Sequence, residues 1–169
     1  MVRTLRFLLV LITVSLMSSA AYPAVLSGIN FAGGGMFEFG GLTMGYAGVG
    51  GDFGIGSHFS LGVRGYVGHG DRLVWGVGPQ ARIYFIPKSG AHFQPYTAVG
   101  GGYGITYAED YWGYLEDQPG GYAHVGLGTD FGFWGQSMAP FFDVGSLMLF
   151  GDDTHVFLYV QSGVRFGIW

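Results

Sequence analysis

The chain has no cysteine among its 169 residues, and only 11% of its residues are charged. Without cysteine it can form neither a disulfide framework nor a lipid anchor attached through a thiol. Typical globular proteins carry about 25% charged residues, yet Lys88 is the only lysine here. The formal charge of −4 argues against nucleic-acid binding, which requires a basic surface. The sequence therefore indicates neither a disulfide-rich module nor an ordinary charged soluble domain.

Long apolar runs are also scarce. Arg3 and Arg6 precede an apolar segment from Phe7 to Met17, and small residues follow as far as Ala21. This order is typical of a secretory signal, and about eleven apolar residues are too few to span a bilayer as a helix. We expect residues 1–21 to be a cleavable signal peptide and residues 22–169 to be one exported domain. No run of 18 uninterrupted apolar residues occurs in the exported part, so no spanning helix is predicted there.

Glycine and aromatic residues are abundant instead, with 34 glycines and 18% aromatics. The glycines follow no three-residue repeat, so a collagen-like chain is excluded. The chain ends in HVFLYVQSGVRFGIW, where apolar side chains recur at every second position, as in a β-strand. A tilted strand of about fifteen residues rises roughly 40 Å, which is enough for a bilayer core and its interfaces. This length favours a membrane strand over a soluble one.

Turn signals divide the exported part into eight candidate strands. They lie at residues 28–39, 42–53, 57–69, 72–86, 92–107, 120–133, 138–150 and 155–168. Each strand has one apolar and one mixed face, and the charged residues within the strands share the mixed face. These residues, predicted to form an interior charge network, are Glu38, Asp52, Arg64, Arg82, Asp130, Asp143 and Arg165. The predicted fold is all-β, an eight-stranded antiparallel up-and-down transmembrane β-barrel over residues 22–169.

Alternation alone does not say which face is inside, so a soluble lipocalin-like barrel with an apolar interior remains open. Two features favour the membrane barrel. A soluble barrel would expose many Lys and Glu side chains, and this chain has a single lysine. In addition, aromatic residues of the apolar face gather at two levels, as they do at bilayer interfaces. The two levels are Phe59, Phe85, Phe93, Phe133 and Phe166, and Trp75, Tyr107 and Phe150.

Eight strands leave an interior that side chains can fill, not a wide pore. We expect the inward glycines to accommodate the rings of Tyr66, Tyr84 and Tyr96 across the lumen; these glycines are Gly100, Gly102, Gly104, Gly126 and Gly128. A charge-paired plug is predicted at the periplasmic end of the barrel, because buried charges persist only when paired. Its members are Asp52, Arg82, Asp130, Asp143 and Arg165.

The longest predicted loop, AEDYWGYLEDQP at residues 108–119, lies on the outer side, where long loops are expected. Most acidic residues of the chain lie in the predicted connections on this outer side: Asp71, Glu109, Asp110, Glu116, Asp117, Asp152 and Asp153. Exposed aromatic residues mark interaction sites, so Tyr111, Trp112 and Tyr114 are the predicted loop contacts. Two pairs, His69 with Asp71 and His155 with the acids before it, are too sparse for a metal site, and no metal or cofactor is predicted.

The segments GVGPQARIYF and PYTAVGGGYG and the aromatic last strand GVRFGIW resemble the small outer-membrane β-barrels of Gram-negative bacteria, the OmpA/OmpX-like superfamily. The resemblance implies an outer-membrane location, contact with lipid and lipopolysaccharide, and insertion by the barrel-assembly machinery. That machinery reads the last strand, here through Phe166, Ile168 and Trp169. Phe166 and Ile168 share the lipid face, whereas Trp169 falls in the opposite register.

The function predicted from these features is a structural, adhesive or surface-interaction role carried by the outer loops, without catalysis. One alternative is a barrel that transports or binds small hydrophobic molecules. A second alternative is a lipid A-modifying enzyme, because some deacylases are similar in using a His-x-Ser pair on a barrel strand, as His58 and Ser60 could provide. Two inward polar residues are more often part of an interior network.

Overall fold

The computed structural model describes residues 25–38, 43–56, 58–70, 72–86, 92–109, 115–132, 138–151 and 154–168. They form eight strands: β1 (Val25–Glu38), β2 (Thr43–Ile55), β3 (Phe59–His69), β4 (Leu73–Tyr84), β5 (Phe93–Glu109), β6 (Leu115–Phe131), β7 (Met138–Phe150) and β8 (Thr154–Ile168). The expected signal peptide at residues 1–21 lies outside the described residues. Over the described part of the chain, no helix is long and apolar enough to cross a membrane.

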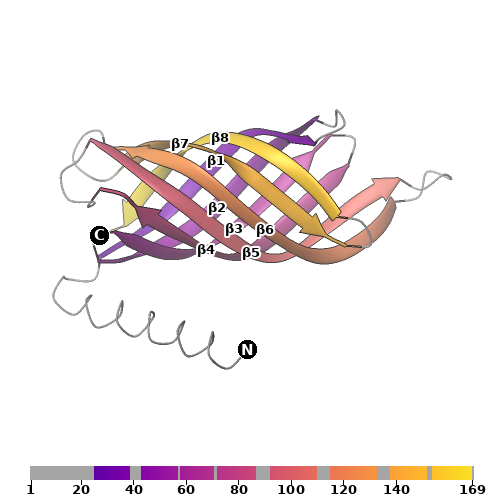
Figure 1. The fold of residues 1–169 in the computed structure, drawn as a ribbon, viewed down its shortest axis with the longest axis horizontal. Helices are drawn as coiled ribbons and strands as arrows, with labels where there is room; N and C mark the ends of the chain where they lie inside the picture. The colour runs from indigo at the N-terminus through magenta and orange to yellow at the C-terminus, as the bar shows by residue number, and fades with distance from the viewer. Residues whose placement is uncertain are drawn as a thin grey trace, which may run out of the picture.

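The strands make a closed barrel in sequence order, with each strand antiparallel to its neighbours (Figure 1). β8 pairs with β1 from Ile168 opposite Ser27 to Phe157 opposite Glu38, which closes the sheet. The predicted all-β, eight-stranded up-and-down barrel is confirmed. We call the end where β1 begins and β8 finishes the terminal end, and the opposite end, which includes the β5–β6 connection, the hairpin end.

Seven of the eight strands agree with the sequence prediction to within about three residues at each end. The exception is β6, which begins at Leu115 instead of residue 120, while β5 continues to Glu109. The β5–β6 ladder runs unbroken to the pair of Glu109 and Leu115, so the expected loop at 108–119 was wrong and the connection is 110–114. Pro119 is the reason why the start of β6 was predicted too late in the chain. It lies beyond the first β6–β7 pair, Gly121 with Phe150, on an edge where proline is tolerated.

As a result, the β5–β6 hairpin projects past the other strands at the end opposite the carboxyl terminus (Figure 1). It is formed by the two longest strands, which have 17 residues each. The residues of β6 before Gly121 pair with β5 on one side. On the other side they extend past Gly121, the first residue of β6 that pairs with β7.

The apolar faces of the strands point outward and the mixed faces point inward. In β3, Leu61 and Val63 are exposed while Ser60 and Arg64 are buried, and the same alternation runs through β4. A soluble barrel would have the opposite arrangement, with its charged side chains outside. Every residue of the two predicted aromatic levels is among the described residues except Phe133. Phe85, Phe93 and Phe166 are exposed near the terminal end, and Trp75 packs against the exposed Tyr103 near the hairpin end.

Candidate functional site

The terminal half of the lumen contains a cluster of paired charges from alternate strands. Arg82 of β4 binds Asp52 of β2 with an Nη1 to Oδ2 distance of 2.5 Å. Arg165 of β8 contacts Asp130 of β6, and its Nε lies 3.3 Å from the same oxygen of Asp52. Inward residues of alternate strands lie at one level of a barrel, so these four residues form one connected group, which we call the charge cluster.

Neutral donors also bind the carboxylates of the charge cluster. Asn30 donates from Nδ2 to Asp52 Oδ2 over 2.9 Å, and the hydroxyl of Tyr84 donates to Asp130 Oδ2 over 3.0 Å. Asp52, Arg82 and Asp130 are almost completely buried. Because charges this deeply buried are costly unless they are paired, the cluster holds its strands in one arrangement.

The other three residues of the predicted network lie elsewhere. Asp143 is not in the terminal plug where the sequence placed it. It sits one layer further into the lumen and accepts hydrogen bonds from Tyr159 over 3.2 Å and Tyr96 over 3.4 Å. Arg64 donates to the hydroxyl of Tyr46 and to Oε1 of Gln161. The height of Asp143 in the barrel was misjudged because it was inferred from distance along the strand. The strands are tilted and staggered, so residues equally far from their strand ends differ in height.

Glu38 lies at the hairpin end and contacts His155. The Nδ1 of His155 is 2.7 Å from Oε1 of Glu38, and its Nε2 is 3.1 Å from Nη1 of Arg72. The three side chains form a small polar group at the mouth of the barrel, apart from the charge cluster. Across the described residues, no group of three His, Asp or Glu side chains could hold a metal ion.

Inward glycines provide room for large rings, and the clearest case is Gly128 beside Tyr96. A Cβ atom on Gly128 would lie 2.6 Å from Cζ of Tyr96. Of the other predicted glycines, Gly100 faces the ring of His124, and Gly104 lies near the hydroxyl of Tyr66. Small residues beside rings therefore allow the lumen to be packed across its width.

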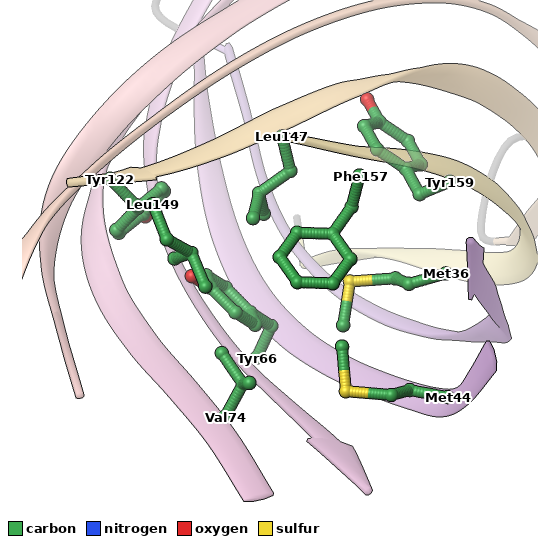
Figure 2. Close-up of a cluster of buried hydrophobic side chains, with 9 residues drawn as sticks. All are labelled: Met36, Met44, Tyr66, Val74, Tyr122, Leu147, Leu149, Phe157 and Tyr159. Carbon is green, nitrogen blue, oxygen red and sulfur yellow. The ribbon is translucent and has the colours of Figure 1, made fainter. Parts of the chain in front are cut away.

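An apolar cluster fills the hairpin half of the lumen, and sequence reasoning missed it. Figure 2 shows its side chains projecting into the barrel. We call these residues the apolar plug: Met36, Met44, Tyr66, Val74, Tyr122, Leu147, Leu149, Phe157 and Tyr159. A signal was present, because Leu147 and Leu149 share the register of Asp143, and Phe157 shares that of Arg165. The inward face thus changes from charged near the terminal end to largely apolar toward the hairpin end, as far as the polar group at the mouth.

The possible catalytic pair is not arranged as a nucleophile and base. Ser60 is buried in the lumen, and its hydroxyl has no hydrogen-bond partner among the described residues. His58 is exposed just before β3, and its backbone oxygen accepts a hydrogen bond from the Tyr84 amide over 2.8 Å. The buried Ser60 hydroxyl offers no surface to a lipid acyl chain.

The predicted surface and assembly residues are only partly described. Tyr111, Trp112, Tyr114 and Trp169 lie outside the described residues, as do Asp71, Asp110, Asp152 and Asp153. The backbone of Glu109, Glu116 and Asp117 belongs to the paired end of the β5–β6 hairpin. Phe166 is exposed on the outer face, where its ring packs edge to face against Phe31, and the backbone of Ile168 pairs with Ser27.

Neither protein-family models nor curated protein sequences gave a match to this chain. Solved structures gave matches. The crystal structure of Neisserial surface protein A (NspA) is similar with a TM-score of 0.65 and 12% identity, over 87% of this chain and 100% of that chain. The amino-terminal β-barrel domain of Pseudomonas aeruginosa OprF gives a TM-score of 0.63 and 13% identity, over 83% and 97%.

Ail, the attachment invasion locus protein of Yersinia pestis, is a more distant neighbour. Its crystal structure gives a TM-score of 0.51 with 15% identity, over 83% of this chain and 97% of that chain. All three neighbours are matched over nearly their whole length, and at these identities the likeness concerns the fold. The closed eight-stranded barrel, its outward apolar face and these neighbours show that the chain has the fold of the small outer-membrane β-barrels, as in the OmpA/OmpX-like proteins.

Proposed function

We propose that this protein is an integral protein of the bacterial outer membrane that acts at the cell surface through its hairpin-end loops, in a structural or adhesive role. The observation that carries the proposal is the combination of a filled lumen with a projecting hairpin. The apolar outer face suits contact with lipid and lipopolysaccharide. Because side chains fill the lumen, the loops are the part of the protein that a partner can reach.

The filled lumen argues against the transport alternative. The charge cluster occupies the terminal half, and the apolar plug occupies the hairpin half. Phe157 and Met36 in the plug are at most 1% exposed, so a passing molecule would have to displace packed side chains. A barrel that carried hydrophobic molecules would need an open upper lumen or a lateral gap, whereas here every neighbouring pair of strands is joined.

The β5–β6 hairpin supports a surface-interaction role. Its ladder extends to Glu109 and Leu115 and presents the connection 110–114, which contains Tyr111, Trp112 and Tyr114. A paired ladder restricts the backbone that leads to these aromatic residues, so ordering them on binding costs less entropy than it would in a long free loop. This is the arrangement expected of a contact surface.

The charge of the hairpin indicates the chemistry of its partner. Glu109, Asp110, Glu116 and Asp117 all lie in or beside the connection, and no Lys or Arg lies between residues 83 and 164 except Lys88. One structure of Ail contains a heparin analogue, sucrose octasulfate. Because like charges repel, we expect the present hairpin to bind a neutral or basic surface and to reject such a sulfated polyanion.

The location is tested by fractionation and by gel mobility with and without boiling in detergent. An outer-membrane barrel should appear in the outer-membrane fraction and shift in mobility on boiling, because the closed barrel resists detergent until it is heated. Recovery from the soluble periplasm without a shift would refute the membrane location and favour a soluble ligand barrel.

The surface role is tested by replacing Tyr111, Trp112 and Tyr114 with serine in cells that display the protein. The substitutions leave the ladder intact, whereas deletion of residues 109–118 would remove paired backbone. Binding of the cells to host cells or matrix should fall to the level of cells without the protein. The control is Asp152→Asn with Asp153→Asn in the β7–β8 connection, which should bind normally. Equal binding by the aromatic variant would refute the role of the hairpin.

A further inference from the structure

A small hollow lies in the middle of the lumen, between the charge cluster and the outer part of the apolar plug. The hollow is lined by seven side chains: Tyr46 of β2, Arg64 and Tyr66 of β3, Tyr122 and His124 of β6, Leu147 of β7 and Tyr159 of β8. These side chains come from two separate groups of strands, β2–β3 and β6–β8, so only closure of the barrel brings them together. The hollow has room for about one water-sized sphere.

Four polar atoms of this lining are buried without a hydrogen-bond partner among the described residues. They are Nε of Arg64, Nε2 of His124 and the hydroxyls of Tyr66 and Tyr122. The four residues are only 4% to 8% exposed. A buried polar atom without a partner is costly. The described residues contain nine such side-chain atoms, and four of them belong to residues that line this hollow, which indicates a ligand that satisfies them together.

All four atoms can donate a hydrogen bond. The Nε of Arg64 can only donate, the two hydroxyls can rotate to donate, and Nε2 of His124 carries the proton in one of the two neutral tautomers. No carboxylate lines the hollow. A water molecule can accept two of these hydrogen bonds and must donate to the other two atoms, whereas a halide ion accepts from all four and also attracts the guanidinium charge of Arg64.

The charges around the hollow also favour an anion. Of the three arginines in the depth of the lumen, Arg82 and Arg165 contact carboxylates. The contacts of Arg64 within the described part of the chain are to the neutral Tyr46 and Gln161. Asp143, the remaining carboxylate of this region, accepts hydrogen bonds from tyrosines and interacts with the charge of Arg64 without a direct contact.

We propose that this hollow, the Arg64 site, binds one monatomic anion of the halide class, such as chloride. The available space excludes sulfate, phosphate and organic acids, and the four donors and the guanidinium provide the attraction. The bound ion is enclosed by the barrel, so it binds the folded protein and not the unfolded chain. Halide therefore stabilises the barrel by mass action, independently of any role of the loops.

The test compares thermal unfolding of the full barrel in chloride, bromide and gluconate at one ionic strength. The protein is refolded from urea in each salt, so that the ion can enter while the lumen forms. Chloride and bromide should raise the midpoint by roughly 5 to 10 °C over gluconate when the halide is near a hundred times its dissociation constant. Equal midpoints in the three salts would overturn the proposal.

Two matched variants separate the site from general packing. Tyr122→Phe removes one donor of the Arg64 site and should weaken halide affinity by roughly tenfold, read from the halide concentration dependence of the midpoint. Tyr96→Phe removes a hydroxyl that binds Asp143 from outside the lining of the hollow and should leave the halide dependence unchanged. A halide effect that survives in Tyr122→Phe at full strength would overturn the assignment of the site.

Crystals grown in bromide give a direct reading. The expected result is an anomalous peak within hydrogen-bonding distance of Arg64 Nε. Density for water alone at that position would overturn the proposal, whatever the salt effect on stability.

Discussion

Replacing Arg82 with methionine tests whether the charge cluster stabilises the barrel. The side chain of Arg82 is 1% exposed and its guanidinium contacts Oδ2 of Asp52. The same oxygen accepts a hydrogen bond from the side-chain amide of Asn30 and lies near Nε of Arg165. Breaking a buried ion pair by removing one partner costs about 3–5 kcal/mol. Because Asp52 keeps two donors, we expect a loss near the lower bound, about 3 kcal/mol.

The assay is urea unfolding of the protein refolded into lipid vesicles, followed by tryptophan fluorescence and by loss of the boiling-dependent mobility shift. Adding Asp52→Asn to Arg82→Met removes the carboxylate that lost Arg82, so the two losses together should be smaller than their sum, which a double-mutant cycle measures as coupling. The control is Arg72→Met at the mouth of the barrel, where the contact is with His155 and the expected loss is below about 1 kcal/mol. A loss below about 1 kcal/mol for Arg82→Met, or additive losses in the double variant, would refute the reasoning.

Three further substitutions test the packing, the outer face and the last strand. Gly128→Ala places a Cβ against an interior tyrosine ring and should cost about 1–3 kcal/mol in the same unfolding assay, whereas Gly45→Ala, which meets only a backbone oxygen at 3.6 Å, should be nearly neutral. Equal losses would count against the crowded lumen. Val63→Arg on the exposed face should cost about 2–4 kcal/mol in vesicles, and a neutral effect would contradict contact of this face with lipid. Phe166→Ala should lower the amount of assembled barrel in cells more than Trp169→Ala does, and the reverse order would assign the assembly signal to the last residue.

The strands and their faces could be predicted because alternation is a local property. Leu61 and Arg64 lie in opposite registers of β3 whatever the rest of the chain does. The end of β6 was less predictable, because Pro119 is a turn signal in most contexts. Its acceptance in a strand depended on β7 ending at Phe150, about thirty residues later in the chain.

The interior was harder to predict than the strands. The inward charges were identified from their shared register, and the structure brings Asp52, Arg82, Asp130 and Arg165 together. Their partners depend on the stagger of strands that are 30 or more residues apart in the chain. The apolar plug was missed because the inward faces were treated as uniform along the barrel, although Phe157 and Arg165 lie in different halves of β8.

By itself, the sequence determined that the chain forms eight strands with one apolar face each, and that the charged side chains within the strands share the other face. The physical reason is that a strand alternates its side chains with period two, so sidedness can be counted along the chain. Only the tertiary structure decided which inward charges meet, that an apolar plug follows them toward the hairpin end, and that donors of β3 and β6 meet in one hollow. These features arise from closure of β8 on β1 and from the stagger of the strands, which set the height at which distant residues meet.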